Sequence, residues 1–330
     1  MNTIKIVSGA EKRWYGQPLR FDPEDGETII PPAGEGNGYW AGAPSVLYDD
    51  ESSRFYLSYR VRKPRPVRGG ECYIAESSDG VAFRTLWGSP KEAFGSESVE
   101  RFSLTRALDG AWLLYVSYVD PVDQRWRIDL IEADSPGAFD VDRREKVLTA
   151  EDIGAEGVKD PWVMIVSGLY YMLVSYAETL PVPESERERM HASADIYNTG
   201  LTRSSTGLAV SGDGRRYTWQ GSLFTPQPDA WDAYAARLGC LVPTAQGWVG
   251  FYDGAASVDE NYEERTGMVQ TWDLRHFWRL SQEKPSLVSP HGSGGLRYVD
   301  AVVFDDQIYF YYEYCRADGS HELRLNRVPR

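Results

Sequence analysis

The segment LYYMLVSY at residues 169–176 decides the fold, because the chain repeats its design. The segment is short, rich in aromatic and β-branched residues, and follows a turn signal, as expected of a buried β-strand. Four other segments share this design: RFYLSYR (54–60), AWLLYVSY (111–118), GWVGFYDG (247–254) and IYFYYEY (308–314). Ser58, Ser117 and Ser175 occupy equivalent places, 59 and 58 residues apart. Self-similarity at this period indicates a repeat architecture.

Further strand-like segments flank each of these five. Those before them are APSVLY (43–48), ERFSLT (100–105), DPWVMI (160–165), LGCLVP (238–243) and DAVVF (300–304). Those after them lie within 71–83, 126–139, 206–217, 266–278 and 321–328, and three of these carry a DG or PG turn before an aromatic residue. Residues 184–196 are the only fair helical candidate, so the sequence predicts an all-β protein.

Repeated four-stranded units predict a β-propeller of five blades, forming a single domain over residues 1–330. The last unit lacks room for a fourth strand, and we expect Thr3–Val7 to supply it and close the ring, which removes an open sheet edge. Residues 181–200 are expected as an insertion between the third and fourth blades, placed to cover the channel. A pair of β-sandwiches is the competing architecture.

Composition restricts the classes of function. A hydrophobic content of 42% with 13% aromatic residues is typical of a globular protein with a full core. The formal net charge of -14 argues against nucleic acid or an anionic membrane as a partner. No apolar run reaches the length of a membrane span, and the start of the chain has no extended apolar region of a signal peptide, so we expect a cytoplasmic protein. The oligomeric state stays open.

The cysteines and histidines show no metal-ligand spacing. Cys72, Cys240 and Cys315 are an odd number of isolated thiols, and they suggest neither a disulfide framework nor a metal site. We therefore expect no cofactor and no metal. The segment HELR (321–324) ends the last unit and is interpreted as surface.

Carboxylates recur where the inner strands begin. In a propeller these starts converge on one mouth of the central channel, and alignment of the units places five residues there: Ala43, Glu100, Asp160, Arg237 or Leu238, and Asp300. Like charges held close together raise one another's pKa, which can separate an acid from a base. We therefore take Glu100, Asp160 and Asp300 as the candidate catalytic residues.

Each carboxylate also has a simpler interpretation. Asp160 precedes a proline and could belong to an ordinary turn. Glu100 beside Arg101 and Asp300 near Arg297 could form local ion pairs. The shared register of all three favours a function.

Aromatic and polar groups beside these carboxylates suit a sugar, because the C–H faces of sugars stack on rings while hydroxyls bind carboxylate and guanidinium groups. The alternative is that these aromatic rings only pack the core. The candidate substrate-binding residues are Trp40, Arg101, Trp162, His191, Asp232 and Arg237.

With these motifs, the sequence resembles the five-bladed propeller glycosidases of glycoside hydrolase families 43, 32 and 68, and the mannoside phosphorylases and related enzymes of family 130. KDP (159–161) is similar to the RDP motif of the family 32 group, SYRVRK (58–63) with AESSDGVAF (75–83) resembles the first blade of family 130, and GWVGFYDG (247–254) resembles a later blade. The resemblance implies a carbohydrate substrate. It would allow a Ca²⁺ ion in the channel, although no local motif for one is present.

The sequence departs from this pattern at the first blade. Families 43 and 32 have an aspartate at its head, where this chain has Ala43, so no base or nucleophile carries over there. A phosphorylase needs a cationic pocket, and RVRKPRPVR (60–68) could supply one, although we interpret this run as a solvated loop.

The sequence thus predicts a glycoside hydrolase. Glu100 would be the general acid with a raised pKa, Asp160 would orient the sugar as the RDP resemblance implies, and Asp300 would be the base or nucleophile. A phosphate-dependent glycoside phosphorylase and a non-catalytic glycan-binding propeller are the alternatives.

Overall fold

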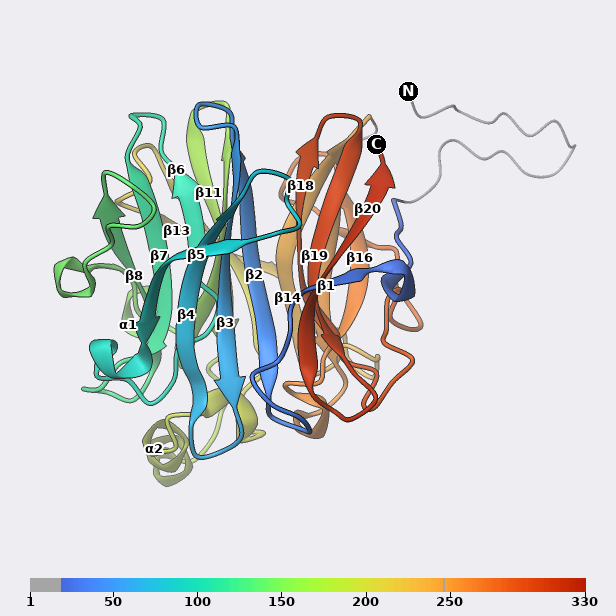
Figure 1. Ribbon diagram of the computed structural model, residues 1–330. Helices are drawn as coiled ribbons and strands as arrows, with labels where there is room; N and C mark the ends of the chain where they lie inside the picture. The colour runs from blue at the N-terminus through green and yellow to red at the C-terminus, as the bar shows by residue number, and fades with distance from the viewer. Residues whose placement is uncertain (1–18, 246) are drawn as a thin grey trace, which may run out of the picture.

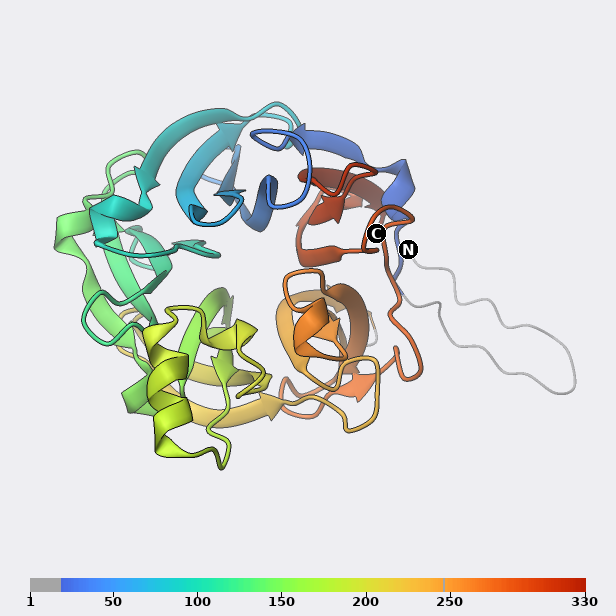
Figure 2. The same ribbon diagram turned by 90° about the horizontal axis from the view of Figure 1, so that it is seen from below.

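The computed structural model describes residues 19–245 and 247–330, and they are nearly all β. The long strands run roughly along one direction (Figure 1). Seen along that direction, successive groups of strands follow one another around a common axis (Figure 2). The arrangement is that of a β-propeller.

In the described residues, antiparallel pairing joins the strands into five groups. The first is β2 (Trp40–Asp49), β3 (Arg54–Lys63), β4 (Arg68–Ser77) and β5 (Arg84–Pro90), and the second is β6 (Ser103–Arg106), β7 (Trp112–Val119), β8 (Trp126–Ala133) and β9 (Glu145–Leu148). The third is β10 (Gly157–Val166), β11 (Leu169–Ala177), β12 (Ser204–Ser211) and β13 (Thr218–Phe224), and the fourth is β14 (Ala235–Thr244), β15 (Gly247–Ala255), β16 (Arg265–Thr271) and β17 (Trp278–Arg279). The fifth is β18 (Leu296–Phe304), β19 (Gln307–Cys315), β20 (His321–Pro329) and β1 (Glu27–Ile30).

Helices are few and short. They are α1 (Ala150–Ile153) and α2 (Glu184–Ala192), with 3-10 turns at Pro23–Asp25, Lys91–Phe94, Val141–Arg143, Ile196–Asn198 and Val258–Glu260. No helix in the described ranges is long and apolar enough to cross a membrane.

The five repeated segments of the sequence are the second strands of the five groups, as predicted. These strands are buried on both faces, and in β7 every residue is buried. Burial on both faces favours continuous aromatic and β-branched runs rather than strict alternation. The core lies between neighbouring groups: Tyr56 and Ile74 of the first pack with Leu104 and Leu114 of the second.

A recurrent turn follows the third strand of three groups. Asp79 accepts hydrogen bonds from the backbone N–H groups of Val81 and Ala82, and Ser77 Oγ accepts one from Gly80. Asp213 and Asp273 cap the corresponding turns in the same way. These side-chain acceptors fix the tight reversal that leads to the outermost strand.

The two ends of the described chain meet in the fifth group. β1 pairs with β20, so a segment near residue 30 lies beside one near residue 325 (Figure 1). The segment Thr3–Val7, expected at this edge, lies outside the described residues.

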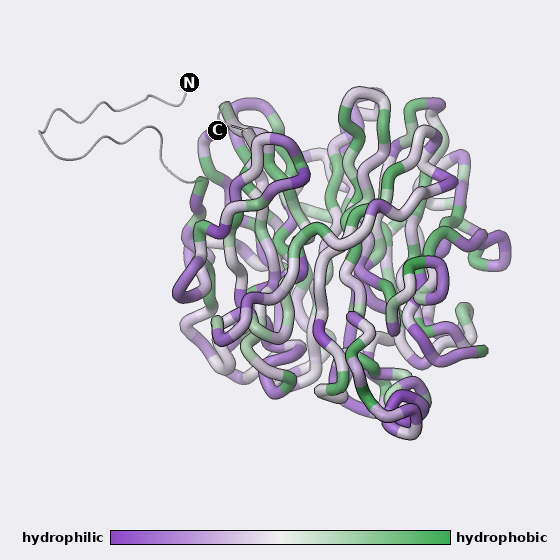
Figure 3. The backbone as a smooth tube through the Cα atoms, turned by 180° about the vertical axis from the view of Figure 1, so that it is seen from behind, coloured by the Kyte–Doolittle hydropathy of each residue, from purple (hydrophilic) through white to green (hydrophobic). Residues whose placement is uncertain are grey.

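The insertion at 181–200 lies inside the third group, between β11 and β12, and not after that group as expected. The pairing of Ala177 with Ser204 shows that one hairpin carries the whole segment as its connection. Its helix α2 is shorter than the predicted 184–196 and is mostly hydrophilic (Figure 3).

Candidate active site

Four of the first strands contain a bulge close to their start. The register with the second strand shifts by one residue in β2, β10, β14 and β18. Ala43, Asp160 and Tyr298 lie in these bulges with positive φ angles of 51°, 54° and 54°. A non-glycine residue in this conformation is strained, and such strain is concentrated at functional sites.

The bulges decide which residues share a level around the axis. Lys159 faces Ser175, and Arg297 faces Glu313, just before their bulges. By this register the first strands contribute one level of residues: Gly42, Glu100, Lys159, Arg237 and Arg297. The level therefore carries cations as well as the carboxylate of Glu100.

Asp300 lies on a different level from Asp160. It follows the bulge and faces Tyr311, as Trp162 faces Leu173. Tyr298 is the residue that matches Asp160 in conformation. The expected common level of Asp160 and Asp300 is wrong, because the bulge and the two-residue offset from Tyr298 to Asp300 do not show in an alignment of the repeats.

Buried ion pairs run around the charged level. Arg60 Nε lies 3.0 Å from Glu100 Oε1, and Arg60 Nη2 lies 2.7 Å from Glu313 Oε2. Arg297 Nη2 lies 2.8 Å from Glu313 Oε1, and its Nη1 lies 2.8 Å from Glu264 Oε2. Arg237 pairs with the other oxygen of Glu264. We call these six residues the ion-pair chain: Glu100, Arg60, Glu313, Arg297, Glu264 and Arg237.

The ion-pair chain lowers the pKa of Glu100. Burial alone would raise this pKa, but Arg60 and then Lys159 lower it by more, so it ends below the ordinary value. The predicted raised pKa of Glu100 is wrong, because its charged neighbours are cations and not the other carboxylates. A carboxyl group with a lowered pKa is ionised near neutral pH, so Glu100 is not suited to be the general acid.

Asp160 is a buried carboxylate with few partners. Its Oδ2 lies 3.1 Å from Lys159 Nζ, and neither carboxylate oxygen accepts a hydrogen bond from a described residue. Its backbone N–H donates to Ser117 Oγ at 3.3 Å. Only 5% of Asp160 is exposed, so these free acceptor positions are costly unless a ligand satisfies them.

Glu313 fills the space beside Gly42 and Ala43, at the start of the first strand of the first group. A Cβ added at Gly42 would lie 2.0 Å from Glu313 Oε2, and Ala43 N–H donates to that same oxygen at 3.2 Å. The absence of a side chain at Gly42 therefore leaves room for a carboxylate from the fifth group. Arg297 and Arg60 hold the pKa of Glu313 well below its usual range despite burial.

Asp300 and Arg101 form a separate cluster further along the first strands. Asp300 accepts hydrogen bonds from Trp162 Nε1 and Val46 N–H, both at 2.8 Å, and Arg101 Nη2 lies 3.5 Å away. Arg101 also donates to the carbonyls of Pro44 and Gly239, each at 2.9 Å. We call Arg101, Asp300 and Trp162 the channel cluster. Its contacts join several strand groups and satisfy most of its polar atoms.

Asp253 is a carboxylate that sequence reasoning missed. It faces Arg237 in the register of β14 and β15, and both its oxygens accept the backbone N–H of Tyr298, at 3.0 and 3.1 Å. Burial and then the charge of Glu264 raise its pKa to about 7. The only signal in the sequence was its place in GWVGFYDG, two residues beyond the buried aromatic Phe251.

The remaining predicted substrate-binding residues divide between two places. Trp40 lies at the charged level, where its ring stacks on His321 with centroids 4.6 Å apart and lies 4.9 Å from the Arg297 guanidinium. Arg237 also belongs there, as a member of the ion-pair chain. Asp232 instead binds Arg279 Nε at 2.8 Å and the Tyr252 hydroxyl at 3.1 Å, away from the ion-pair chain.

The insertion covers part of the face at which the first strands begin (Figure 2). His191 of α2 reaches Glu156 Oε2 at 2.8 Å. Asp195 lies 3.2 Å from Arg68 Nη2 and also binds Arg65 and Tyr262. The segment is therefore tied to the third, first and fourth groups.

Tyr197 of the insertion lies against the cations of the site. The Lys159 Nζ and the Arg237 guanidinium lie 5.0 and 5.3 Å from the centre of its ring. Its hydroxyl donates to the carbonyl of Gly157 or Ser175, both at 3.3 Å. The ring thus closes one side of the charged level.

Two predictions about exposure are wrong. Within RVRKPRPVR, Arg60, Arg62 and Arg68 are buried, because β3 and β4 carry them inward to carboxylates and aromatic rings. His321 of HELR is fully buried, since it stacks on Trp40 and binds Glu313.

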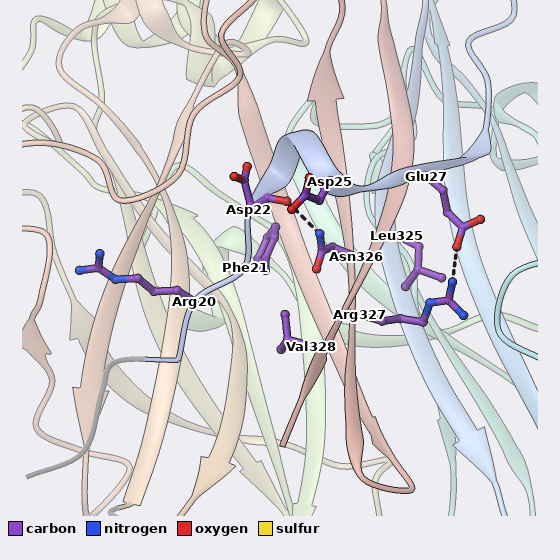
Figure 4. A pocket seen from close by; sticks show the side chains of 9 residues that line it. All are labelled: Arg20, Phe21, Asp22, Asp25, Glu27, Leu325, Asn326, Arg327 and Val328. Atoms are coloured by element: carbon purple, nitrogen blue, oxygen red, sulfur yellow. Dashed lines mark hydrogen bonds and ion pairs between the residues drawn. The ribbon is translucent and has the colours of Figure 1, made fainter. Parts of the chain in front are cut away.

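A cavity of about 520 Å³ lies at the outer edge of the fifth group (Figure 4). Residues 20–27 and β20 line it, and Arg327 pairs there with Glu27 at 2.8 Å. None of its lining residues belongs to the ion-pair chain or the channel cluster, so we do not assign it to the candidate active site.

No protein-family model matches the sequence, and no curated protein matches it significantly. Solved structures share the fold. A glycosyl hydrolase from Bacteroides ovatus is 14% identical, with 92% of each chain covered and a TM-score of 0.61. The β-1,2-mannobiose phosphorylase from Listeria innocua, solved with β-1,2-mannobiose, is 18% identical over 92% of this chain and 94% of that one, with a TM-score of 0.58.

A third structure, 15% identical, comes from work on the GH130 family of mannoside phosphorylases. That family contains glycoside hydrolases that target β-1,2 mannosidic linkages in Candida mannan. The match to this structure covers 93% of this chain and 95% of that chain, with a TM-score of 0.59. The chain therefore resembles the glycosidase-like β-propellers, including GH130, as the sequence motifs indicated.

Proposed function

We propose that this chain is a five-bladed propeller, closed by β1, that acts on a glycoside at the charged level of its first strands. The observation that carries the proposal is Asp160, a buried carboxylate in a strained bulge whose two oxygens accept no hydrogen bond from the described chain. Arg60 Nη1 is a buried donor without a hydrogen-bond acceptor among the described residues. A hydroxyl group both donates and accepts, so a polyhydroxylated ligand can satisfy both kinds of atom.

The ionisation states suggest how the work divides. Glu100 acts as the ionised carboxylate, as base or nucleophile, because Arg60 and Lys159 lower its pKa. Asp160 orients the sugar by accepting its hydroxyl hydrogens. Asp253, with a pKa of about 7, is the carboxyl group suited to hold a proton for the leaving oxygen. Asp300 keeps a structural place in the channel cluster.

Phosphorolysis is the second candidate, because the site contains buried cations. Arg60, Arg62 and Arg297 gather around Trp40 and Glu313, where an anion could displace a carboxylate partner. The likeness to the Listeria innocua phosphorylase supports testing it. A bound phosphate would then serve as the nucleophile in place of water.

The test is a screen of aryl arabinofuranosides, xylosides, fructosides, mannosides and galactosides, together with β-1,2-mannobiose, with and without inorganic phosphate. We expect turnover of at least one compound, and loss of turnover with retained sugar binding in Glu100→Gln. Glu188→Gln, an exposed residue of α2, is the matched control and should keep full activity. Binding without turnover in the unmodified chain would instead support a glycan-binding propeller, and neither binding nor turnover would overturn the proposal.

A further inference from the structure

We propose that Cys315, His321 and Glu263 form a binding site for a borderline-soft divalent metal ion of the Zn²⁺ class. One donor atom from each of these residues lies within 4.8 Å of the other two. Thiolate, imidazole and carboxylate are the ligand types that Zn²⁺ selects, whereas Mg²⁺ and Ca²⁺ prefer oxygen alone. The proposal does not depend on the glycoside activity.

The fold brings the ligands together although the sequence spacing does not suggest a site. Cys315 ends β19, His321 begins β20, and the two face each other as a cross-strand pair. The turn between them is closed by Arg316 N–H donating to the Ser320 carbonyl at 2.8 Å. Glu263 comes from the loop before β16, and its Oε2 lies 3.1 Å from His321 Nε2.

The imidazole is held in the orientation that a ligand needs. His321 Nδ1 lies 2.8 Å from Glu313 Oε1, which leaves Nε2 facing Glu263. The ring is also stacked on Trp40, with an interplanar angle of 19°. A carboxylate on the far nitrogen is the usual outer partner of a metal-bound histidine, because it fixes the tautomer and the ring direction.

Backbone without side chains surrounds the ligands. A Cβ at Gly292 would lie 2.8 Å from Cys315 Sγ, and one at Gly295 would lie 2.9 Å from Glu263 Oε2. Ser293, between these glycines, binds Glu263 through its hydroxyl, which lies 3.7 Å from Cys315 Sγ. The two glycines therefore let the loop pass close to Cys315 and Glu263, and Ser293 adds a hydroxyl that contacts both of these residues.

Ligand separations agree with a site that contracts slightly around an ion. Zn–N and Zn–O bonds of about 2.1 Å and a Zn–S bond of about 2.3 Å put tetrahedral ligand atoms roughly 3 to 4 Å apart. The Glu263 side chain is 22% exposed, so an ion can reach the cluster from solvent. On binding, the thiol proton and the proton that His321 Nε2 donates to Glu263 pass to solvent, and the sulfur and the nitrogen bond to the metal.

The experiment is metal titration of the full chain after treatment with a chelator. We expect one Zn²⁺ retained per chain after dialysis, and with Co²⁺ the thiolate-to-metal charge-transfer absorption of a sulfur-ligated site. Cys315→Ser and His321→Gln should abolish the charge-transfer band and lower the retained metal at least ten-fold. Cys240→Ser removes another buried thiol and should leave both readouts unchanged.

A second measurement uses the unmodified chain, in case the variants do not fold. Alkylation of each cysteine is followed by peptide mass mapping, with and without Zn²⁺. We expect Zn²⁺ to slow the modification of Cys315 at least ten-fold and to leave that of Cys72 and Cys240 unchanged. No retained metal together with equal alkylation rates would overturn the proposal, as would full retention in folded Cys315→Ser and His321→Gln.

Discussion

Asp160 beside the charged level and Asp300 in the channel cluster are both buried aspartates, but they differ in the hydrogen bonds that they accept. Asp300 accepts hydrogen bonds from Trp162, Val46 and Ala301 and faces Arg101. Asp160 forms an ion pair with Lys159 and accepts no hydrogen bond from the described residues. A carboxylate whose acceptors are satisfied can stabilise the fold, whereas a buried one that accepts no hydrogen bond is costly and requires an explanation such as a bound ligand. The comparison therefore distinguishes a carboxylate whose partners are all within the fold from the one that we propose binds a ligand.

The largest expected effect is on turnover. Asp160→Asn should lower kcat/KM for the glycoside found in the screen by about 10²- to 10⁴-fold, because the amide cannot accept from every hydroxyl that the carboxylate orients. The amide also leaves the buried Lys159 ammonium without its counter-ion, so thermal unfolding is recorded and kcat/KM is measured on the folded variant well below its transition. The same measurement is made on Asp300→Asn and expressed per folded molecule. If that variant loses as much kcat/KM as Asp160→Asn does, the distinction between the two carboxylates fails.

The next effect is on stability at the channel cluster. Asp300→Ala should lower the free energy of unfolding by about 3–5 kcal/mol, because Arg101 stays buried with its charge uncompensated. Chemical denaturation measures the change. Arg101→Met in the same background should recover part of the loss, since it removes that charge, and absence of any recovery would contradict the assigned pairing.

The pH dependence of stability should reflect Asp253. Its folded pKa of about 7 lies above its ordinary value of 3.8, so the folded chain holds the proton more tightly than the unfolded chain does. The stabilisation is fully present at low pH, declines as the pH rises from about 4 to 7, and is lost above pH 7, with a total of at most about 4 kcal/mol.

Asp253→Asn should remove this decline, because the amide is neutral at every pH. The variant should therefore be more stable than the unmodified chain at pH 8 and similar to it at pH 4, by denaturant unfolding at both values. A parallel pH profile in both proteins would show that Asp253 does not titrate near neutrality.

The smallest expected effect concerns the insertion over the charged level. Tyr197→Phe should cost about 1 kcal/mol of stability, because one buried hydroxyl loses its carbonyl acceptor at Gly157 or Ser175. The ring and its contacts with Lys159 and Arg237 are retained, so kcat should change little. A loss of kcat as large as that of Asp160→Asn would place the Tyr197 hydroxyl in the reaction itself.

Much of the fold could be predicted from local patterns. The aromatic strands at 54–60, 111–118, 169–176, 247–254 and 308–314 were each found as the second strand of a group. The turns at Asp79 and Asp213 were visible as DG pairs, since the residue types that allow a tight reversal are few. The position of the insertion inside the third group was missed, because a strand hairpin can carry a long connection without any change in its own pattern.

The candidate site could be predicted only in part. Glu100 and Asp160 lie at neighbouring places at the start of the second and third groups, but Arg60, Glu313 and Glu264 of the ion-pair chain come from second strands and a loop. Nothing in the local sequence marks those residues as neighbours. The same holds for Cys315, His321 and Glu263, whose proximity follows from one hairpin register and one loop of the preceding group.

The sequence by itself determined the repeat, the all-β class and the aromatic second strands, because side-chain periodicity and turn chemistry act between residues close in the chain. Only the tertiary structure decided that cations surround Glu100, that Asp160 and Asp300 lie on different levels, and that Glu313 fills the space left by Gly42. The physical reason is that a single-residue bulge changes the register of every residue after it, and that charges act through space on groups far apart in the chain.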